Sequence, residues 1–317
     1  MDWLSRLLDM TPVSGHLDIR CHYGAPWRID FGPSEGEIPY HVVVGGSAVL
    51  EAPWGGVRRV TAGDILMLPH GGPYSLHDGS GAPPAPARYR ESLNLTISEN
   101  AGTGERLDML CGRFALTPTH DRLLRTYVAP ILVVSASGRS ASTARPGTDL
   151  QLAGLVNLMR SESAVDNLGG RAMLNALSTA MFALIWRIAS ESPETPAGLL
   201  ALASHSRLAP ALAALFNEPD RPWSLPELAR LCHMSRATIA RHFQQKLGRT
   251  ANDLLTDIRV TLAANKLRNS SVSITAVAEA VGYQSEAAFQ RVFKRRMGMT
   301  PAQWRRASGQ DQSWPPS

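Results

Sequence analysis

The chain has 317 residues, with 32 lysines and arginines against 27 aspartates and glutamates, and only three cysteines. This length allows two or three domains, and 44% hydrophobic residues is ordinary for a globular protein and excludes a disordered chain. The sequence shows us no apolar run of membrane-spanning length, and residues 1–10 lack the basic start and apolar core of a signal peptide. Few cysteines suit a reducing compartment. We therefore expect a cytoplasmic protein with no membrane partner.

The N-terminal part, residues 1–134, predicts a short amphipathic helix followed by a β-rich domain. Apolar residues spaced along residues 1–10 form one helical face. Between residues 19 and 134, short β-prone runs alternate with glycine and proline, as in an antiparallel sandwich or barrel. Such runs occupy residues 40–52, 57–69, 89–98 and 107–116.

Residues 135–200 predict a linker and then a helical segment for dimerisation or coupling. The stretch 135–146 is polar, whereas residues 150–162 and 168–189 are rich in leucine, methionine and alanine. These two helices can pack on the barrel or form a dimer interface, and the pattern does not decide between the two. The prolines of residues 193–196 indicate a hinge.

The last third of the chain contains one motif twice, in residues 224–250 and 276–306. The two copies share helix caps, apolar positions and arginines at corresponding places. The matching pairs are Ser235 with Ser285, Ile239 with Phe289, Arg241 with Arg291, Phe243 with Phe293, Gly248 with Gly298, and Thr250 with Thr300. Such a repeat indicates one supersecondary unit used twice.

Each copy is typical of a helix-turn-helix. Ser224 and Glu227 fit a capping box, and Ser235 and Ser285 fit N-caps of the second helices. Gly282 suits the left-handed residue that ends a helix, whereas the first copy has Cys232-His233-Met234 there, a less permissive turn. The alternative, two amphipathic hairpins with a solvated basic face, does not explain why both copies keep the same caps and arginines.

Charge also favours nucleic-acid binding by the repeat region. Residues 206–317 hold sixteen lysines and arginines and eight acidic residues, a net charge of +8, whereas the preceding residues carry −3. A surplus of this size on one region is the electrostatic signature of a nucleic-acid binder. Lys294, Arg295 and Arg296 are candidates for phosphate contacts, and Arg241 and Arg291 for guanine edges.

The pattern A-x-x-V-G-Y…F-x-R-x-F-K-R-x-x-G-x-T-P-x-x-W-R in residues 276–306 resembles the signature of AraC/XylS-type transcriptional regulators. The resemblance covers residues 206–306 and includes a connecting helix near residues 252–268. It implies that the two second helices enter successive major grooves, about 34 Å apart. The implied DNA-binding positions are Arg236, Ala237, Thr238, Arg241 and His242 in the first copy, and Ser285, Glu286, Ala287, Gln290, Arg291, Lys294 and Arg295 in the second. Alanines 237 and 240 give the first copy fewer polar groups.

His41, Gly63-Asp64 and Pro69 resemble the cupin-type sensor domain found ahead of many such modules. The alternative class is a metal-dependent cupin enzyme, which needs two or three imidazoles and a carboxylate around the metal. Tyr74 stands where the later motif of such enzymes has a histidine, and His77 follows three residues on. We therefore expect no catalytic residue and no cofactor, with His41 and His77 as candidate effector contacts and the metal content unknown.

Two cysteines are candidates for signal detection. Cys21, with Gly24 and Trp27, and Cys111 resemble AraC-type regulators that sense reactive chlorine or other electrophiles through cysteines of the N-terminal domain. A redox sensor requires a reactive thiolate near a second thiol. The alternatives are buried inert thiols, or a zinc site of cysteine and histidine ligands that involves Cys21, His22 or Cys111. Cys232 is expected to be a small core residue.

Together these features predict an α+β protein: an antiparallel cupin-like barrel, a helical segment and an all-helical double helix-turn-helix. The expected ranges are 1–134 for the sensor, 135–200 for the linker and coupling helices, 206–308 for DNA binding and 309–317 for a disordered tail. The predicted function is a sequence-specific transcription regulator that binds double-stranded promoter DNA. The resemblance implies activation and contact with RNA polymerase, although repression is equally compatible with these residues. We also expect a homodimer.

Overall fold

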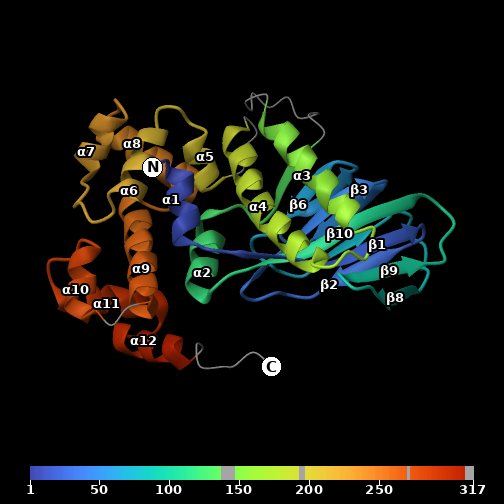
Figure 1. The fold of residues 1–317 in the computed structure, drawn as a ribbon. Helices are drawn as coiled ribbons and strands as arrows, with labels where there is room; N and C mark the ends of the chain where they lie inside the picture. Colours follow the sequence, from blue (N-terminus) through green and yellow to red (C-terminus); the bar gives the residue numbers. More distant parts are fainter. Residues whose placement is uncertain (137–146, 193–196, 270–271, 311–317) are drawn as a thin grey trace. The chain divides into compact units, whose positions relative to one another are not determined.

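The computed structural model describes residues 1–136, 147–192, 197–269 and 272–310, which form two compact units. The sheet unit contains residues 13–117 and 128–196, and the helical unit contains residues 1–12, 118–127 and 197–317 (Figure 1). The two units interleave along the chain, whereas the expected ranges 1–134, 135–200 and 206–308 are consecutive. Most of the expected linker 135–146, the hinge 193–196 and most of the tail 309–317 lie outside the described residues.

The described strands of the sheet unit form two sheets. A seven-stranded sheet has the order β11-β6-β3-β10-β1-β9-β8, and a four-stranded sheet has the order β2-β7-β4-β5. The strands are β1 (Ser14–Gly24), β2 (Arg28–Phe31), β3 (Glu37–Gly45), β4 (Ser47–Ala52), β5 (Gly56–Thr61), β6 (Asp64–Met67), β7 (Tyr74–His77), β8 (Ala87–Glu91), β9 (Thr96–Asn100), β10 (Arg106–Ala115) and β11 (Leu132–Ser135). The predicted α+β class is confirmed. One pairing departs from the antiparallel expectation, because β1 and β9 run parallel.

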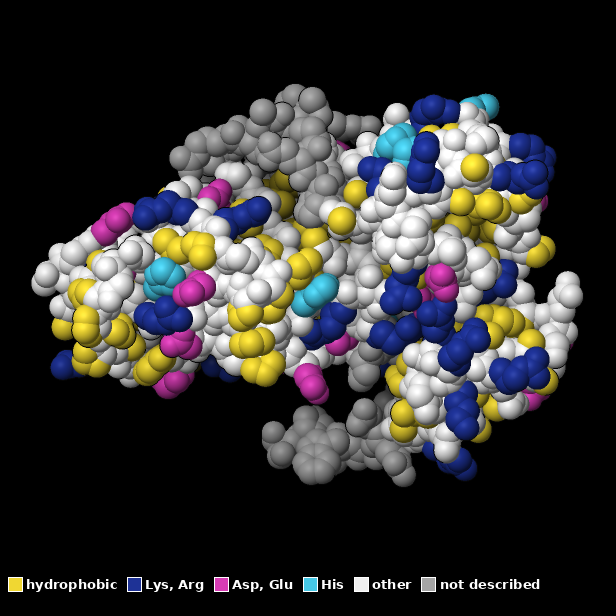
Figure 2. Space-filling model, turned by 180° about the vertical axis from the view of Figure 1, so that it is seen from behind, with side chains coloured by type: hydrophobic (Ala, Val, Ile, Leu, Met, Phe, Trp, Pro, Cys, Tyr) yellow, Lys and Arg dark blue, Asp and Glu magenta, His cyan; other side chains and the backbone are white. Residues whose placement is uncertain are grey.

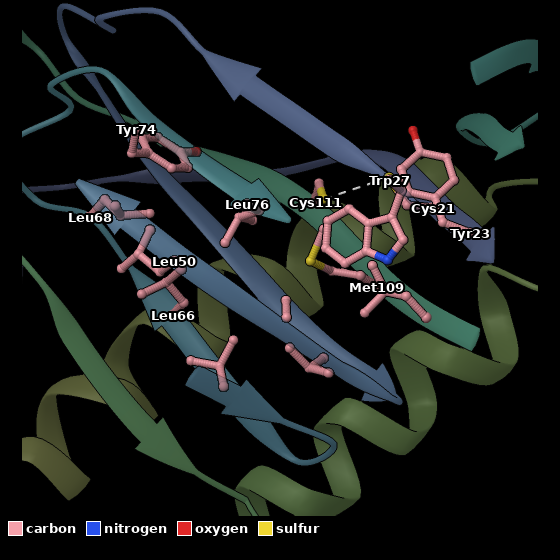
Figure 3. Packing of buried hydrophobic residues seen from close by; sticks show 14 of the residues in the cluster. Cys21, Tyr23, Trp27, Leu50, Leu66, Leu68, Tyr74, Leu76, Met109 and Cys111 are labelled. Atoms are coloured by element: carbon pink, nitrogen blue, oxygen red, sulfur yellow. Dashed lines mark hydrogen bonds between the residues drawn. The ribbon is translucent and has the colours of Figure 1, made fainter. Parts of the chain in front are cut away.

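The main core of this unit combines side chains from both sheets. Tyr23, Met109 and Leu66 come from the seven-stranded sheet, and Leu50 and Leu76 from the four-stranded one (Figure 3). Because side chains alternate between the faces of a strand, a strand such as β10 contributes every second residue to this core, here Leu107, Met109 and Cys111. The apolar runs seen in the sequence therefore form the inner faces of the two sheets.

Two helices complete the sheet unit, α3 (Thr148–Glu162) and α4 (Gly170–Glu191). Tyr40 of β3 lies with its hydroxyl 2.6 Å from that of Ser178, and Phe114 of β10 packs edge-on against Phe182. Directly opposite Tyr40 in the sheet stands Gly112, where a Cβ would come within 2.5 Å of the tyrosine ring. Packing on the sheet, one of the two roles left open for these helices, is thus confirmed for α4.

Among the described helices, α4 is long and apolar enough to cross a membrane, judged by length and composition alone. This corrects the sequence-based statement that no apolar run of that length is present. The core helix of a soluble protein meets the same criterion. Leu174, Phe182 and Trp186 of α4 are buried, and Phe182 packs against Phe114 of β10.

The helical unit contains both predicted helix-turn-helix copies and two helices from earlier in the chain. Its helices are α1 (Trp3–Met10), α2 (Pro118–Tyr127), α5 (Leu199–Ala203), α6 (Ala209–Asn217), α7 (Leu225–Leu231), α8 (Arg236–Leu247), α9 (Ala251–Asn269), α10 (Ile274–Ala280), α11 (Glu286–Met297) and α12 (Pro301–Gln310). The connecting helix predicted near residues 252–268 is α9. Helix α2 was not predicted, because residues 118–127 were assigned to the β-rich domain. It forms because Leu123, Leu124 and Tyr127 bury one helical face.

Candidate nucleic-acid interface and buried thiol cluster

The first helices of the two copies end with the same backbone hydrogen bond despite different sequences, although the second turn is one residue longer. In the first, the Met234 amide donates to the Ala229 carbonyl at 3.0 Å, and in the second the Tyr283 amide donates to the Ala278 carbonyl at 2.9 Å. His233 and Gly282 occupy the same place and both have positive φ, 48° and 87°. His233 therefore adopts a conformation that favours glycine, in a turn that the sequence marked only as less permissive. The turn is set by the hydrogen bonds that end the helix.

The predicted caps are confirmed and orient the second helices. Ser224 and Glu227 form the full capping box at the start of α7. The Ser235 hydroxyl accepts the Thr238 amide at 3.1 Å, and the Ser285 hydroxyl accepts the Ala288 amide at 3.4 Å. Ile239 and Phe243, like Phe289 and Phe293, are buried on the inner faces of α8 and α11. The opposite faces of both helices are consequently presented outward.

The predicted DNA-binding positions fall on these outward faces with different degrees of exposure. The exposed ones are Arg236, Ala237, Arg241, Ser285, Ala287, Arg291, Lys294 and Arg295. The half-buried ones are Thr238, His242, Glu286 and Gln290. The ring of His242 lies 5.2 Å from that of His205, and burial lowers its pKa. Figure 2 shows lysine and arginine side chains gathered over the helical unit, on the right of the view.

Two sequence-based expectations change at α11. The Gln290 amide donates to Glu286 at 2.7 Å, and Glu286 also accepts the hydroxyl of Thr275 from α10. Gln290 is thus already hydrogen-bonded, and Thr275, which the sequence did not single out, orients the same face. Arg296 is not an open phosphate contact, because its side chain is 17% exposed and forms a 2.8 Å ion pair with Asp253. Lys294 and Arg295 keep their exposed positions.

A buried thiol cluster lies inside the sheet unit. Cys21 on β1 and Cys111 on β10 face each other with their sulfurs 4.0 Å apart (Figure 3). Cys21 pairs with Met109 in the register, so the cysteines are diagonal neighbours on adjacent strands. His41, directly opposite Cys111 on β3, places Nδ1 3.1 Å from that sulfur and Nε2 2.7 Å from the hydroxyl of Tyr74. Three of the four predicted effector residues therefore meet.

Three side chains of this cluster are held neutral. Burial lowers the pKa of His41 to about 3, so the imidazole is uncharged at neutral pH. The pKa of the Cys111 thiol is raised well above its usual range, first by its hydrogen bond with Cys21 and then by burial. Burial also raises the pKa of the Tyr74 hydroxyl. His41, Cys111 and Tyr74 therefore form a chain of neutral hydrogen-bonding groups.

The fourth candidate, His77, is engaged elsewhere. Its Nε2 lies 3.7 Å from the Glu51 carboxylate, and its Nδ1 accepts the Gly79 amide at 3.1 Å. His22, the possible zinc ligand, lies 3.7 Å from Asp108. Within the described residues, no group of three or more histidine, cysteine or acidic side chains is placed to hold a metal ion. Cys232 is buried in the helical unit, as expected for a core residue.

Sequence reasoning missed two buried charged groups. Arg20 on β1 binds Asp108 through two hydrogen bonds of 2.7 and 3.0 Å. Asp257 on α9 accepts hydrogen bonds from Arg122 and Tyr127 of α2. Leu123 and Leu124, followed by Tyr127 at helical spacing, could have revealed α2. The partners of Asp257 could not be found this way, because they are distant in the sequence.

Comparisons with known proteins agree with this geometry. Residues 2–191 match the family described as Cupin, and residues 228–307 match the family described as Helix-turn-helix domain. The chain is 30% identical to an uncharacterized HTH-type transcriptional regulator of Haemophilus influenzae, with 97% of this chain and 99% of that protein covered. It is 28% identical to the HTH-type transcriptional regulator MtrA of Neisseria gonorrhoeae, with 98% and 100% covered. It is 27% identical to the RCS-specific HTH-type transcriptional activator RclR of Escherichia coli K12, with 96% and 97% covered.

Proposed function

Because the chain belongs to the AraC-type transcriptional regulators with an N-terminal cupin domain, we propose that it binds two adjacent half-sites of promoter DNA through α8 and α11. The coarser statement, a transcriptional regulator with a DNA-binding helix-turn-helix, follows from family membership. The observation that carries the finer proposal is the repeated geometry. Both copies have a serine N-cap on the second helix, the same backbone hydrogen bond at the end of the first helix, and an exposed arginine, Arg241 or Arg291, at the same place. We assign no catalytic role.

The proposed contacts divide into base-reading and phosphate-binding groups. On α8 the polar base-reading candidates are Arg236, Thr238 and Arg241, with His242 at the edge, and Ala237 offers only apolar contact. On α11, Ser285, Ala287 and Arg291 present the corresponding surface, and the Glu286–Gln290 pair reads bases as one hydrogen-bonded unit. Lys294 and Arg295 then bind phosphate. Direct bidentate contacts determine sequence preference, whereas phosphate contacts supply salt-dependent affinity.

Arg291→Ala is expected to lower operator affinity about tenfold or more and to relax sequence preference in one half-site, because a base contact is lost. Arg241→Ala should act on the other half-site. Lys294→Ala should weaken binding to all sequences and reduce the salt slope by about one. Fluorescence anisotropy on an operator recovered by binding selection measures all three.

The matched control is Arg58→Ala, which removes an exposed arginine from β5 in the sheet unit. It should leave operator affinity unchanged. Binding selection that recovers no preferred sequence would reject the proposal. If Arg58→Ala and Arg291→Ala lower operator affinity equally, the binding is only an unspecific attraction between positive charge and DNA.

We propose further that the signal is an oxidant and that its target is the Cys21–Cys111 pair. The 4.0 Å separation of the sulfurs supports this, because the two sulfurs already face each other and need only close to the bonding distance of about 2.05 Å. With a peroxide, Cys21 is the thiol oxidised to a sulfenic acid, with release of water, because the raised pKa of Cys111 disfavours its thiolate. The second thiol then displaces a further water, leaving a disulfide. The Escherichia coli relative, which is named an RCS-specific transcriptional activator, supports the proposal that the signal is an oxidant.

Mild treatment with hydrogen peroxide or hypochlorous acid should change operator affinity about fivefold or more in the native protein, a typical allosteric coupling. Cys21→Ser and Cys111→Ser should each abolish the change. Cys232→Ser is the control and should respond like the native protein. Peptide mass spectrometry identifies the disulfide. A native response that persists in both variants would exclude this pair as the sensor.

The remaining parts of the proposal concern partners. Residues of α3 and α4 that do not face the sheet include exposed Leu150, Leu158 and Met173, which supports a homodimer. Activation through RNA polymerase is supported by the relative named as an activator, and a cytoplasmic location follows from the same role. Sedimentation of the purified protein and transcription in vitro from the selected operator test these points.

A further inference from the structure

The Cys111 sulfur lies between two neighbours on adjacent strands. The sheet order β3-β10-β1 places Cys111 between His41 on one side and Cys21 on the other. Nδ1 of His41 lies 3.1 Å from the Cys111 sulfur, and the Cys21 sulfur lies 4.0 Å from it. All three residues are buried, with at most 8% of their surface exposed. An imidazole therefore holds the Cys111 thiol from the side opposite to Cys21.

Tyr74 determines which nitrogen of His41 carries the hydrogen. Its hydroxyl lies 2.7 Å from Nε2 of His41, which is the one hydrogen-bond partner of that hydroxyl among the described residues. A buried O–H group that donates to no acceptor is unfavourable. We therefore assign the Tyr74 hydroxyl as the donor to Nε2, which places the imidazole hydrogen on Nδ1, facing the Cys111 sulfur.

Aromatic packing fixes this arrangement before any oxidation takes place. Tyr74 lies on β7 of the four-stranded sheet and reaches His41 of the seven-stranded sheet. The ring of Phe31 stacks on that of Tyr74 with centroids 4.5 Å apart, and it lies 5.0 Å from the ring of His41. A donor held in place by its neighbours stabilises developing charge without first having to reorganise.

We propose that His41 is a positioning residue that holds the Cys111 sulfur and stabilises its negative charge while it attacks oxidised Cys21. The inference rests on the proposed oxidant signal, in which Cys21 becomes a sulfenic acid. The Cys111 thiol loses its proton, and its sulfur attacks the sulfur of Cys21. The S–O bond breaks as the S–S bond forms, and the hydroxide that leaves takes up the proton as water. The N–H of His41 donates to the attacking sulfur, and hydrogen bonds to charged groups are the stronger ones.

The test follows the two steps separately in the full chain after hydrogen peroxide is added. Trapping with dimedone and mass spectrometry measures the sulfenic acid of Cys21, and peptide mass spectrometry measures the disulfide. His41→Leu should slow disulfide closure about tenfold or more, as for a lost hydrogen bond to a charged group, so the sulfenic acid accumulates. The first oxidation of Cys21 should keep its native rate, because His41 is bonded to Cys111 and Tyr74. Cys111→Ser sets the trapping signal expected when no closure occurs.

His41→Asn separates hydrogen bonding from packing. The asparagine amide offers an N–H close to the position of Nδ1, but it fills less of the core than leucine does. If the hydrogen bond to sulfur matters, His41→Asn closes the disulfide faster than His41→Leu. If only the packing matters, the order is reversed, because the smaller side chain leaves the larger cavity.

Two further variants complete the test. Tyr74→Phe keeps both rings in place and frees the imidazole hydrogen to move to Nε2, so it should slow closure about threefold, as for a neutral hydrogen bond. It also tests the inference if the His41 variants fail to fold. His77→Leu is the matched control, because this histidine of the same unit contacts Glu51 and Gly79. It should close the disulfide at the native rate.

The outcomes distinguish this inference from the proposed signal. Closure at the native rate in His41→Leu and Tyr74→Phe, or faster closure in His41→Leu than in His41→Asn, rejects the role of His41 and leaves the oxidant signal standing. If the native protein forms no disulfide between Cys21 and Cys111, the proposed signal itself fails.

Discussion

Gly282→Ala is expected to lower the free energy of unfolding of the helical unit by about 3 kcal/mol, by combining backbone strain with a steric conflict. Gly282 has φ of +87°, and an added Cβ would lie 2.3 Å from the Asp220 carbonyl oxygen. That oxygen accepts a hydrogen bond from Arg259 of α9, so the backbone around it cannot move freely. Hydrogen exchange of the full chain, read separately for each unit, measures the loss.

The equivalent position in the first copy supplies the control. His233 already carries a side chain at φ of 48° and is exposed. His233→Ala should therefore lower the free energy of unfolding by less than about 1 kcal/mol, because it removes only the slight preference of histidine over alanine for this backbone conformation. If Gly282→Ala and His233→Ala lower the free energy of unfolding equally, the conflict between the added Cβ and the Asp220 carbonyl does not contribute to the loss.

Arg20→Ala should lower the free energy of unfolding of the sheet unit by about 3 kcal/mol or more, because it leaves the Asp108 carboxylate without its partner. The Arg20 side chain is 8% exposed. Besides Asp108, it binds the Arg160 carbonyl and the Ser163 hydroxyl at the end of α3, each at 3.1 Å. Its loss should loosen α3 as well as the β1–β10 pair, which hydrogen exchange resolves segment by segment.

Arg113→Ala is the matched control on β10. Arg113 also forms ion pairs, with Asp18 at 2.7 Å and Glu37 at 2.9 Å, but its side chain is 39% exposed. Exposed pairs are weakened by solvent and contribute about 1 kcal/mol or less. A loss for Arg20→Ala no larger than that for Arg113→Ala would contradict the role of burial.

Local features of the DNA-binding region were predictable from sequence because their causes lie within a few residues. The capping box of Ser224 and Glu227 and the inward residues Phe289 and Phe293 depend on spacings of three or four positions. Helix α2 was missed because a short helix between two strands gives a weak signal. The availability of Gln290 and Arg296 was overestimated because a sequence pattern identifies polar groups without showing their partners.

By itself the sequence determined the repeated helix-turn-helix, the α+β class and the concentration of positive charge, since these depend on periodicity, capping and composition. Only the tertiary structure decided which distant side chains meet. It joined Cys21 to Cys111 through the register of β1 and β10, and Arg122 to Asp257 through the packing of α2 on α9. The physical reason is that such pairs depend on strand order and helix packing, which are determined by the packing of all buried side chains together. Caps and turns depend on neighbouring residues alone.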